Sequence, residues 1–83
     1  MERIKDELIK DFLTESGFQM DNFDISEVPF LTGYILTDKN KESMMIVKPL
    51  FTERSIDVTV GRNTYSYVKG FSNIDKQYHW YNV

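Results

Sequence analysis

Side chains suited to catalysis are scarce in this chain of 83 residues. It has one histidine, His79, and no cysteine, so a Cys–His pair is excluded and a Ser–His–Asp triad would depend on His79 alone. The sequence has no Gly-rich phosphate loop and no His-x-x-x-His spacing. Carboxylate pairs such as Asp6/Glu7 and Asp21/Asp24 are typical of any exposed helix or loop. We therefore expect a protein that is not an enzyme.

The residue types also predict neither a metal ion nor a cofactor. A tetrahedral zinc site needs Cys and His ligands, which the sequence cannot supply in sufficient number. Residues 21–27 carry several side-chain oxygens, but they lack both the Asp-x-Asp-x-Asp series and the turn glycine of a calcium loop. Solvated loop polar groups are the better interpretation of that segment.

Aromatic and basic residues gather in the last third of the chain. The set consists of Arg54, Arg62, Lys69 and Lys76 among Tyr65, Tyr67, Phe71, Tyr78, Trp80 and Tyr81. Aromatic rings beside cations on a sheet can stack single-stranded bases. One hypothesis is therefore a single-stranded nucleic-acid-binding module. The net charge of −3 weighs against it, because phosphate binding relies on many cations, and the tyrosines also fit core-facing positions.

Protein binding is the leading hypothesis. The chain has more large apolar side chains than one helix and one small sheet readily bury, and Tyr, Trp, Met and Arg are enriched at the centres of interfaces. The expected partner-binding residues are Phe51, Arg54, Arg62, Tyr78, Trp80 and Tyr81. A homodimer would use the same features, so self-association and the binding of another protein remain alternatives.

Composition adds expectations about source and location. The chain has no alanine and is rich in residues with A/T-rich codons, which indicates an A/T-rich genome such as that of a low-GC bacterium or its phages. From general properties of such small proteins, without a motif, we expect a phage or mobile-element inhibitor that blocks a host protein such as a defence nuclease. The lack of cysteine favours a reducing compartment, and no apolar run approaches the ~20 residues that cross a bilayer, so we expect a cytoplasmic protein.

These side chains must be positioned by a helix and a sheet. An amphipathic helix is expected over residues 2–16, with a left-handed Gly17 after it. Apolar residues recur along one side of this segment: Ile4, Leu8, Ile9, Phe12 and Leu13. We expect this side to pack on a sheet, with Leu8 in the core.

Residues 55–71 predict a β-hairpin, because aliphatic and then tyrosine residues alternate with polar ones on either side of a Gly-Arg-Asn turn. If the two-residue loop is at 62–63, Val60 faces Tyr65. If the loop is at 61–62, Val58 faces Tyr65. Both registers place the aliphatic and tyrosine side chains on one face, so the sequence leaves the turn open.

A second hairpin is expected from arms at 30–37 and 43–50. Both arms contain consecutive apolar residues, a pattern typical of strands covered on both faces. The helix can cover one face. The other must be covered by the connection at 18–29, by the carboxy-terminal tail or by another molecule. Pro49 cannot donate to a ladder, so its end of the arm should lie at an edge or a bulge.

Two segments complete the predicted fold. Part of the connection at 18–29 should pair as a short strand or wrap the core. The tail at 77–83 is expected to be a strand, with a short helix as the alternative. The fold class is α+β: a single domain over residues 1–83, with an N-terminal amphipathic helix packed on a four- to five-stranded antiparallel sheet built from hairpins.

Overall fold

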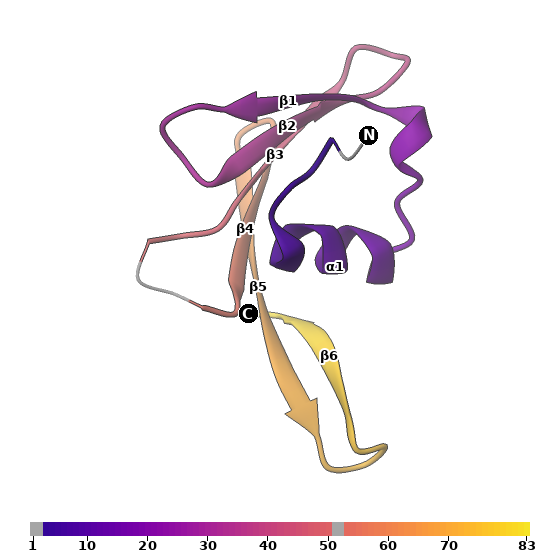
Figure 1. The fold of residues 1–83 in the computed structure, drawn as a ribbon, viewed down its shortest axis with the longest axis vertical. Helices are drawn as coiled ribbons and strands as arrows, with labels where there is room; N and C mark the ends of the chain where they lie inside the picture. Colours follow the sequence, from indigo (N-terminus) through magenta and orange to yellow (C-terminus); the bar gives the residue numbers. More distant parts are fainter. Residues whose placement is uncertain (1–2, 51–52) are drawn as a thin grey trace.

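The computed structural model describes residues 3–50 and 53–83. One α-helix, α1 (Glu7–Glu15), packs on one face of a six-stranded antiparallel sheet, as Figure 1 shows. A short 3-10 turn, η1 (Met20–Asn22), leads from α1 into the sheet. The strands are β1 (Asp24–Val28), β2 (Gly33–Thr37), β3 (Ser43–Val47), β4 (Ser55–Val60), β5 (Asn63–Ser72) and β6 (Gln77–Asn82). The α+β class is confirmed.

The sheet has six strands rather than four or five because the connection at 18–29 and the tail at 77–83 each contribute a strand. Residues Asp24–Val28, from the connection before Pro29, form β1 and pair with β2. The tail forms β6 and pairs with β5, from Ser72↔Gln77 to Tyr67↔Asn82. The strand expected for the tail is therefore confirmed, and each strand is hydrogen-bonded to the next one along the chain.

The β4–β5 hairpin adopts one of its two expected registers. Val58 lies opposite Tyr65 and Ile56 lies opposite Tyr67, which makes Gly61-Arg62 the loop. Gly61 has a φ of 62°, in the left-handed region that glycine tolerates without a steric penalty. The turn chemistry thus selects the register.

The helix begins later than the apolar periodicity predicts, so the expected start at residue 2 is wrong. Asp6 is the N-cap, and its carboxylate accepts a hydrogen bond from the Ile9 amide at 3.0 Å. Ile4 lies in the non-helical lead-in to the helix and is nevertheless buried. The lead-in is held by Tyr34, whose hydroxyl accepts a hydrogen bond from the Lys5 amide at 2.9 Å.

The helix ends as its sequence predicts. Gly17 has a φ of 82°, and its amide donates to the Thr14 carbonyl at 3.2 Å. The Phe18 amide donates to the Leu13 carbonyl at 3.0 Å, which completes a Schellman motif. This motif turns the chain from α1 toward η1 and β1.

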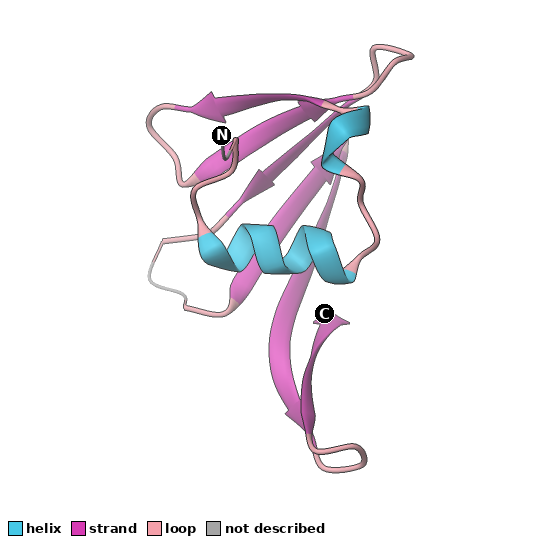
Figure 2. Cartoon of the chain, turned by 45° about the vertical axis from the view of Figure 1, so that its right-hand side comes forward, coloured by secondary structure: helices cyan, strands magenta, loops and turns pink. Residues whose placement is uncertain are grey.

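The hydrophobic core lies between α1 and one face of the sheet, the two layers seen in Figure 2. Leu8, expected in the core, is only partly buried at its margin, because Ile9 and Leu13 fill the helix–sheet space and are fully buried. The buried members are Ile4, Ile9, Phe12, Leu13, Tyr34, Leu36, Ile46, Ile56 and Val58. We call the face of the sheet that packs against α1 the covered face, and the opposite face of the sheet the open face.

Candidate functional site

Strand alternation divides the aromatic residues of β6 between the two faces of the sheet. Trp80 lies on the covered face, where its ring meets Phe12 edge-on at a centroid distance of 5.2 Å. The indole Nε1 donates to the Asp11 carboxylate at 3.1 Å. Tyr81 points to the open face and is 47% exposed. Trp80 therefore ties α1 to the sheet, whereas Tyr81 is presented to solvent.

Two carboxylates fix the helix to the sheet by ion pairs. Asp11 accepts hydrogen bonds from the Lys69 ammonium and from Trp80. Asp6 lies 2.9 Å from the Lys48 ammonium. Burial raises the pKa of the Asp11 carboxyl, but the hydrogen bonds from Lys69 and Trp80 and the Lys69 charge outweigh it, so its pKa lies below the ordinary value. A carboxyl of lowered pKa is ionised at neutral pH and is poorly suited to donating a proton.

The far half of the β5–β6 hairpin, residues 70–79, projects beyond α1 in both ribbon views, and we call it the arm (Figures 1 and 2). Near its base, the Arg54 guanidinium lies over the Tyr78 ring, 5.1 Å from the centroid. Tyr78 meets Phe71 edge-on at 5.2 Å. A hollow of about 310 Å³ opens here between α1 and the arm, lined by Leu8, Glu53, Arg54, Lys69 and Tyr78.

The partner-binding residues predicted from the sequence are only partly brought together. Arg54 and Tyr78 are in contact. Arg62 lies in the β4–β5 turn, seven positions along β5 from the residue that bonds Arg54, which is roughly 20 Å at about 3.3 Å per residue. Tyr81 lies on the opposite face from Tyr78. Phe51 lies outside the described residues.

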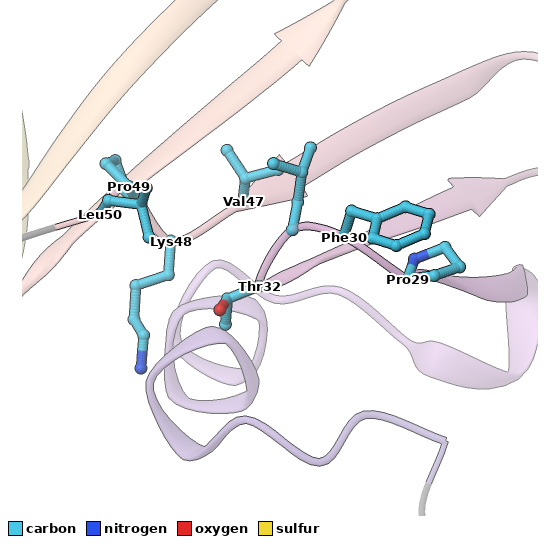
Figure 3. A pocket seen from close by; sticks show the side chains of 8 residues that line it. Pro29, Phe30, Thr32, Val47, Lys48, Pro49 and Leu50 are labelled. Atoms are coloured by element: carbon cyan, nitrogen blue, oxygen red, sulfur yellow. The ribbon is translucent and has the colours of Figure 1, made fainter.

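Sequence reasoning missed a second apolar surface, which we call the loop hollow. It is formed by the β1–β2 turn and the start of the β3–β4 loop, and its volume is about 310 Å³ (Figure 3). Phe30 is 96% exposed and Leu50 is 77% exposed. The lining residues are Pro29, Phe30, Leu31, Thr32, Val47, Lys48, Pro49 and Leu50. Large apolar residues next to prolines in turns were the available signal, because such positions cannot continue a buried strand.

Backbone contacts hold the two sides of the loop hollow close together. The Lys48 amide donates to the Thr32 carbonyl at 2.7 Å. Val47 packs over Gly33 so closely that a Cβ at residue 33 would lie 2.6 Å from its Cγ1 atom. Figure 3 shows the Lys48 side chain turned toward α1, where it pairs with Asp6. Apart from Lys48 and Thr32, the side chains that line the hollow are apolar.

The open face continues this apolar surface across β2 and β3. Ile35 and Met45 are cross-strand partners there, and Val47 lies beside them. The sequence offered three covers for this face. Phe18, Met20 and Phe23 from the connection pack against the core instead, and the tail forms an edge strand. Within the described residues, neither segment covers the open face, and Ile35 there is 36% exposed.

In the described part of the chain, no group of three or more His, Asp or Glu side chains could hold a metal ion. The helices described there, of nine and three residues, are too short to span a membrane. Comparisons with protein-family models, curated proteins and solved structures gave no match.

Proposed function

We propose that this chain is a small, non-catalytic protein-binding module that contacts its partner through the loop hollow and the adjoining part of the open face. The observation that carries the proposal is the exposure of Phe30 and Leu50, at 96% and 77%, around an apolar hollow. Contiguous apolar surface of this kind usually marks an interaction site, because leaving it in water costs free energy.

The shape of the loop hollow supports the proposal. The bond between Thr32 and Lys48 and the contact of Val47 with Gly33 hold the two loops at a fixed separation. A preformed site loses less conformational entropy on binding than a site that must be ordered first. A partner side chain entering the hollow would therefore gain apolar burial at little cost in ordering.

The arm extends the proposed contact surface. The β3–β4 loop supplies Leu50 to the loop hollow and Arg54 to the base of the arm. Arg and Tyr are the types of side chain that dominate binding energy when a partner covers them. Arg54 and Tyr78 are thus a second proposed contact, and Arg54 belongs to the same loop as Leu50.

We further propose that the partner is a host protein and that binding inhibits it. A domain without catalytic groups acts on another protein by occupying its surface. Inhibition by such occupancy agrees with the small size and composition of the chain. A second candidate function is the binding of single-stranded nucleic acid. Arg54 lies over the Tyr78 ring, which in turn meets Phe71, and such an arrangement can stack an unpaired base.

The test is capture from a lysate of a low-GC bacterium treated with nuclease, followed by affinity measurement with the purified captured protein. The test variant combines Phe30→Ser with Leu50→Ser. The matched control is Ile74→Ser, since Ile74 is equally apolar and is 97% exposed at the tip of the arm. We expect the double variant to bind at least about tenfold more weakly, a loss of ~1.4 kcal/mol, and the control to bind like the parent.

Equal affinity in the parent and the double variant would contradict the loop hollow as the contact surface. The contact would then be sought at the arm, with Arg54→Ala and Tyr78→Ala. If an untreated lysate yields RNA or DNA, the treated lysate yields no protein, and Arg54→Ala abolishes the recovery of nucleic acid, the nucleic-acid candidate replaces the protein-binding one.

A further inference from the structure

The two strands at the edges of the sheet, β1 and β6, differ in how well they are protected against pairing with a strand of another molecule. β1 has five residues, carries the charges of Asp24 and Glu27, and is followed directly by Pro29. Charges and proline are the usual devices that prevent an edge from acquiring another strand. β6 has six residues and contains no Asp, Glu, Lys, Arg or Pro. The β6 edge therefore lacks the protection that β1 has.

The backbone groups that β6 presents to solvent follow from its ladder with β5. The Val83 amide donates to the Ser66 carbonyl at 2.9 Å, so residue 83 and every second residue before it face β5. The amides and carbonyls of Tyr78, Trp80 and Asn82 consequently point away from the sheet. In Figures 1 and 2, no other described segment lies along the outer side of β6.

We propose that β6 pairs antiparallel with β6 of a second copy of this chain, about a two-fold axis at Trp80. In this register Trp80 lies opposite the partner's Trp80, and Tyr78 lies opposite the partner's Asn82. All three outward-facing residues of each strand then exchange hydrogen bonds. The axis stands perpendicular to the sheet, so the covered faces of both copies lie on the same side, as a continuous sheet requires.

The side chains favour this register as well. His79 lies opposite the partner's Tyr81 on the open face, in a non-hydrogen-bonded pair, where side chains approach most closely. Tyr81 and Tyr78 are both substantially exposed in the single chain. Aromatic cross-strand pairs stabilise antiparallel ladders, and aromatic residues are enriched in interfaces. A second copy thus covers rings that the single chain leaves in water.

The test is sedimentation equilibrium of the parent, Tyr78→Pro and Tyr78→Ala over micromolar to millimolar concentrations. Both variants lose the Tyr78 ring, but only proline also removes the outward amide and places a methylene group against the second copy. The ladder with β5 does not use this amide. We expect the parent and Tyr78→Ala to form a reversible dimer, and Tyr78→Pro to dimerise at least about tenfold more weakly.

A parent that stays monomeric throughout this range overturns the proposal, and so does equal dimerisation of the two Tyr78 variants. Far-ultraviolet circular dichroism confirms that each variant is folded. The Phe30→Ser and Leu50→Ser double variant should dimerise like the parent, because the loop hollow is not part of this edge. Self-association at β6 and partner capture at the loop hollow can therefore fail independently of each other.

Discussion

A single apolar strand, β3, contributes side chains to both the covered and the open face of the sheet, and the two faces differ in burial. In β3, Ile46 is fully buried under α1, while its neighbours Met45 and Val47 point to the open face. One helix of nine residues can cover only one face of six strands. In a small domain, an unbroken apolar strand therefore supplies half of its side chains to the core and leaves the other half available for contact.

The two faces also differ in where their polar groups lie. On the covered face, ion pairs at Asp6 and Asp11 surround the apolar core. On the open face, polar cross-strand pairs occupy β4 and β5, with Thr59 bonded to Thr64 at 3.0 Å and Ser66 donating to Asp57 at 2.8 Å. The apolar part of the open face therefore lies on β2 and β3, beside the loop hollow, and in a separate pair, Val68 and Tyr81, at the β6 edge.

Substitution of two isoleucines on neighbouring strands should show the largest difference in lost stability between the two faces. Ile46 is 0% exposed on the covered face, and Ile35 is 36% exposed on the open face. Ile46→Ala should lower the free energy of unfolding by about 4 kcal/mol, because it leaves a cavity in the core. Ile35→Ala should lower it by about 1 kcal/mol. Urea denaturation measures both, and equal losses would mean that another molecule or segment covers the open face.

The aromatic residues of β6 extend the comparison to the edge of the sheet. Trp80→Ala removes the ring that packs on Phe12 and the donor to Asp11, so we expect a loss of about 3 kcal/mol. Tyr81→Ala removes a ring that lies where a Cβ added at Gly70 would meet it at 3.5 Å, and should cost no more than about 1 kcal/mol. Thermal unfolding at low concentration distinguishes the two. A larger loss for Tyr81→Ala would reverse the assignment of the faces.

Loss of the ion pair between Asp11 and Lys69 should have the smallest effect on the free energy of unfolding, and this effect should depend most on pH. Because the folded-state pKa of Asp11 is lowered from 3.8, the pair stabilises the fold above that value, and its contribution is lost as the pH falls through the folded-state pKa. Asp11→Asn should cost about 1 kcal/mol at pH 7, since the carboxyl is partly exposed.

Unfolding of Asp11→Asn and the parent between pH 7 and pH 2 provides the check. The difference in stability between them should narrow below about pH 4 as the parent carboxyl is protonated. A difference that stays constant with pH would show that the packing around Asp11, rather than its charge, makes the contribution.

The sequence predicted the parts of this fold that depend on periodicity. Alternation placed the β4–β5 hairpin and limited it to two registers, and Gly17 marked the end of α1. The start of α1 was wrong because the helical spacing extends back to Ile4, which is buried without being helical. The hydrogen bonds that the Ile9 amide donates to the Asp6 carboxylate and the Lys10 amide donates to the Asp6 carbonyl show where the helix begins.

The candidate site was less predictable because it depends on contacts between turns. Phe30 and Leu50 belong to different loops, and no periodic pattern relates two loops across a sheet. The contact of Arg54 with Tyr78 joins two expected residues, but Arg62 was grouped with them only through its position in the sequence. Its distance from Arg54 could be judged only once Arg54 was found to bond Lys69, at the far end of β5 from the turn.

The order of the strands has a consequence for the rate at which the chain folds. Every strand pairs with its neighbour in the chain, so the sheet can form as a series of short loop closures, each with a small entropic cost. The bond from Trp80 to Asp11 joins residues 69 positions apart and closes almost the whole chain. Docking of α1 onto β6 should therefore be the slow step, and the fluorescence of the single tryptophan should report it directly.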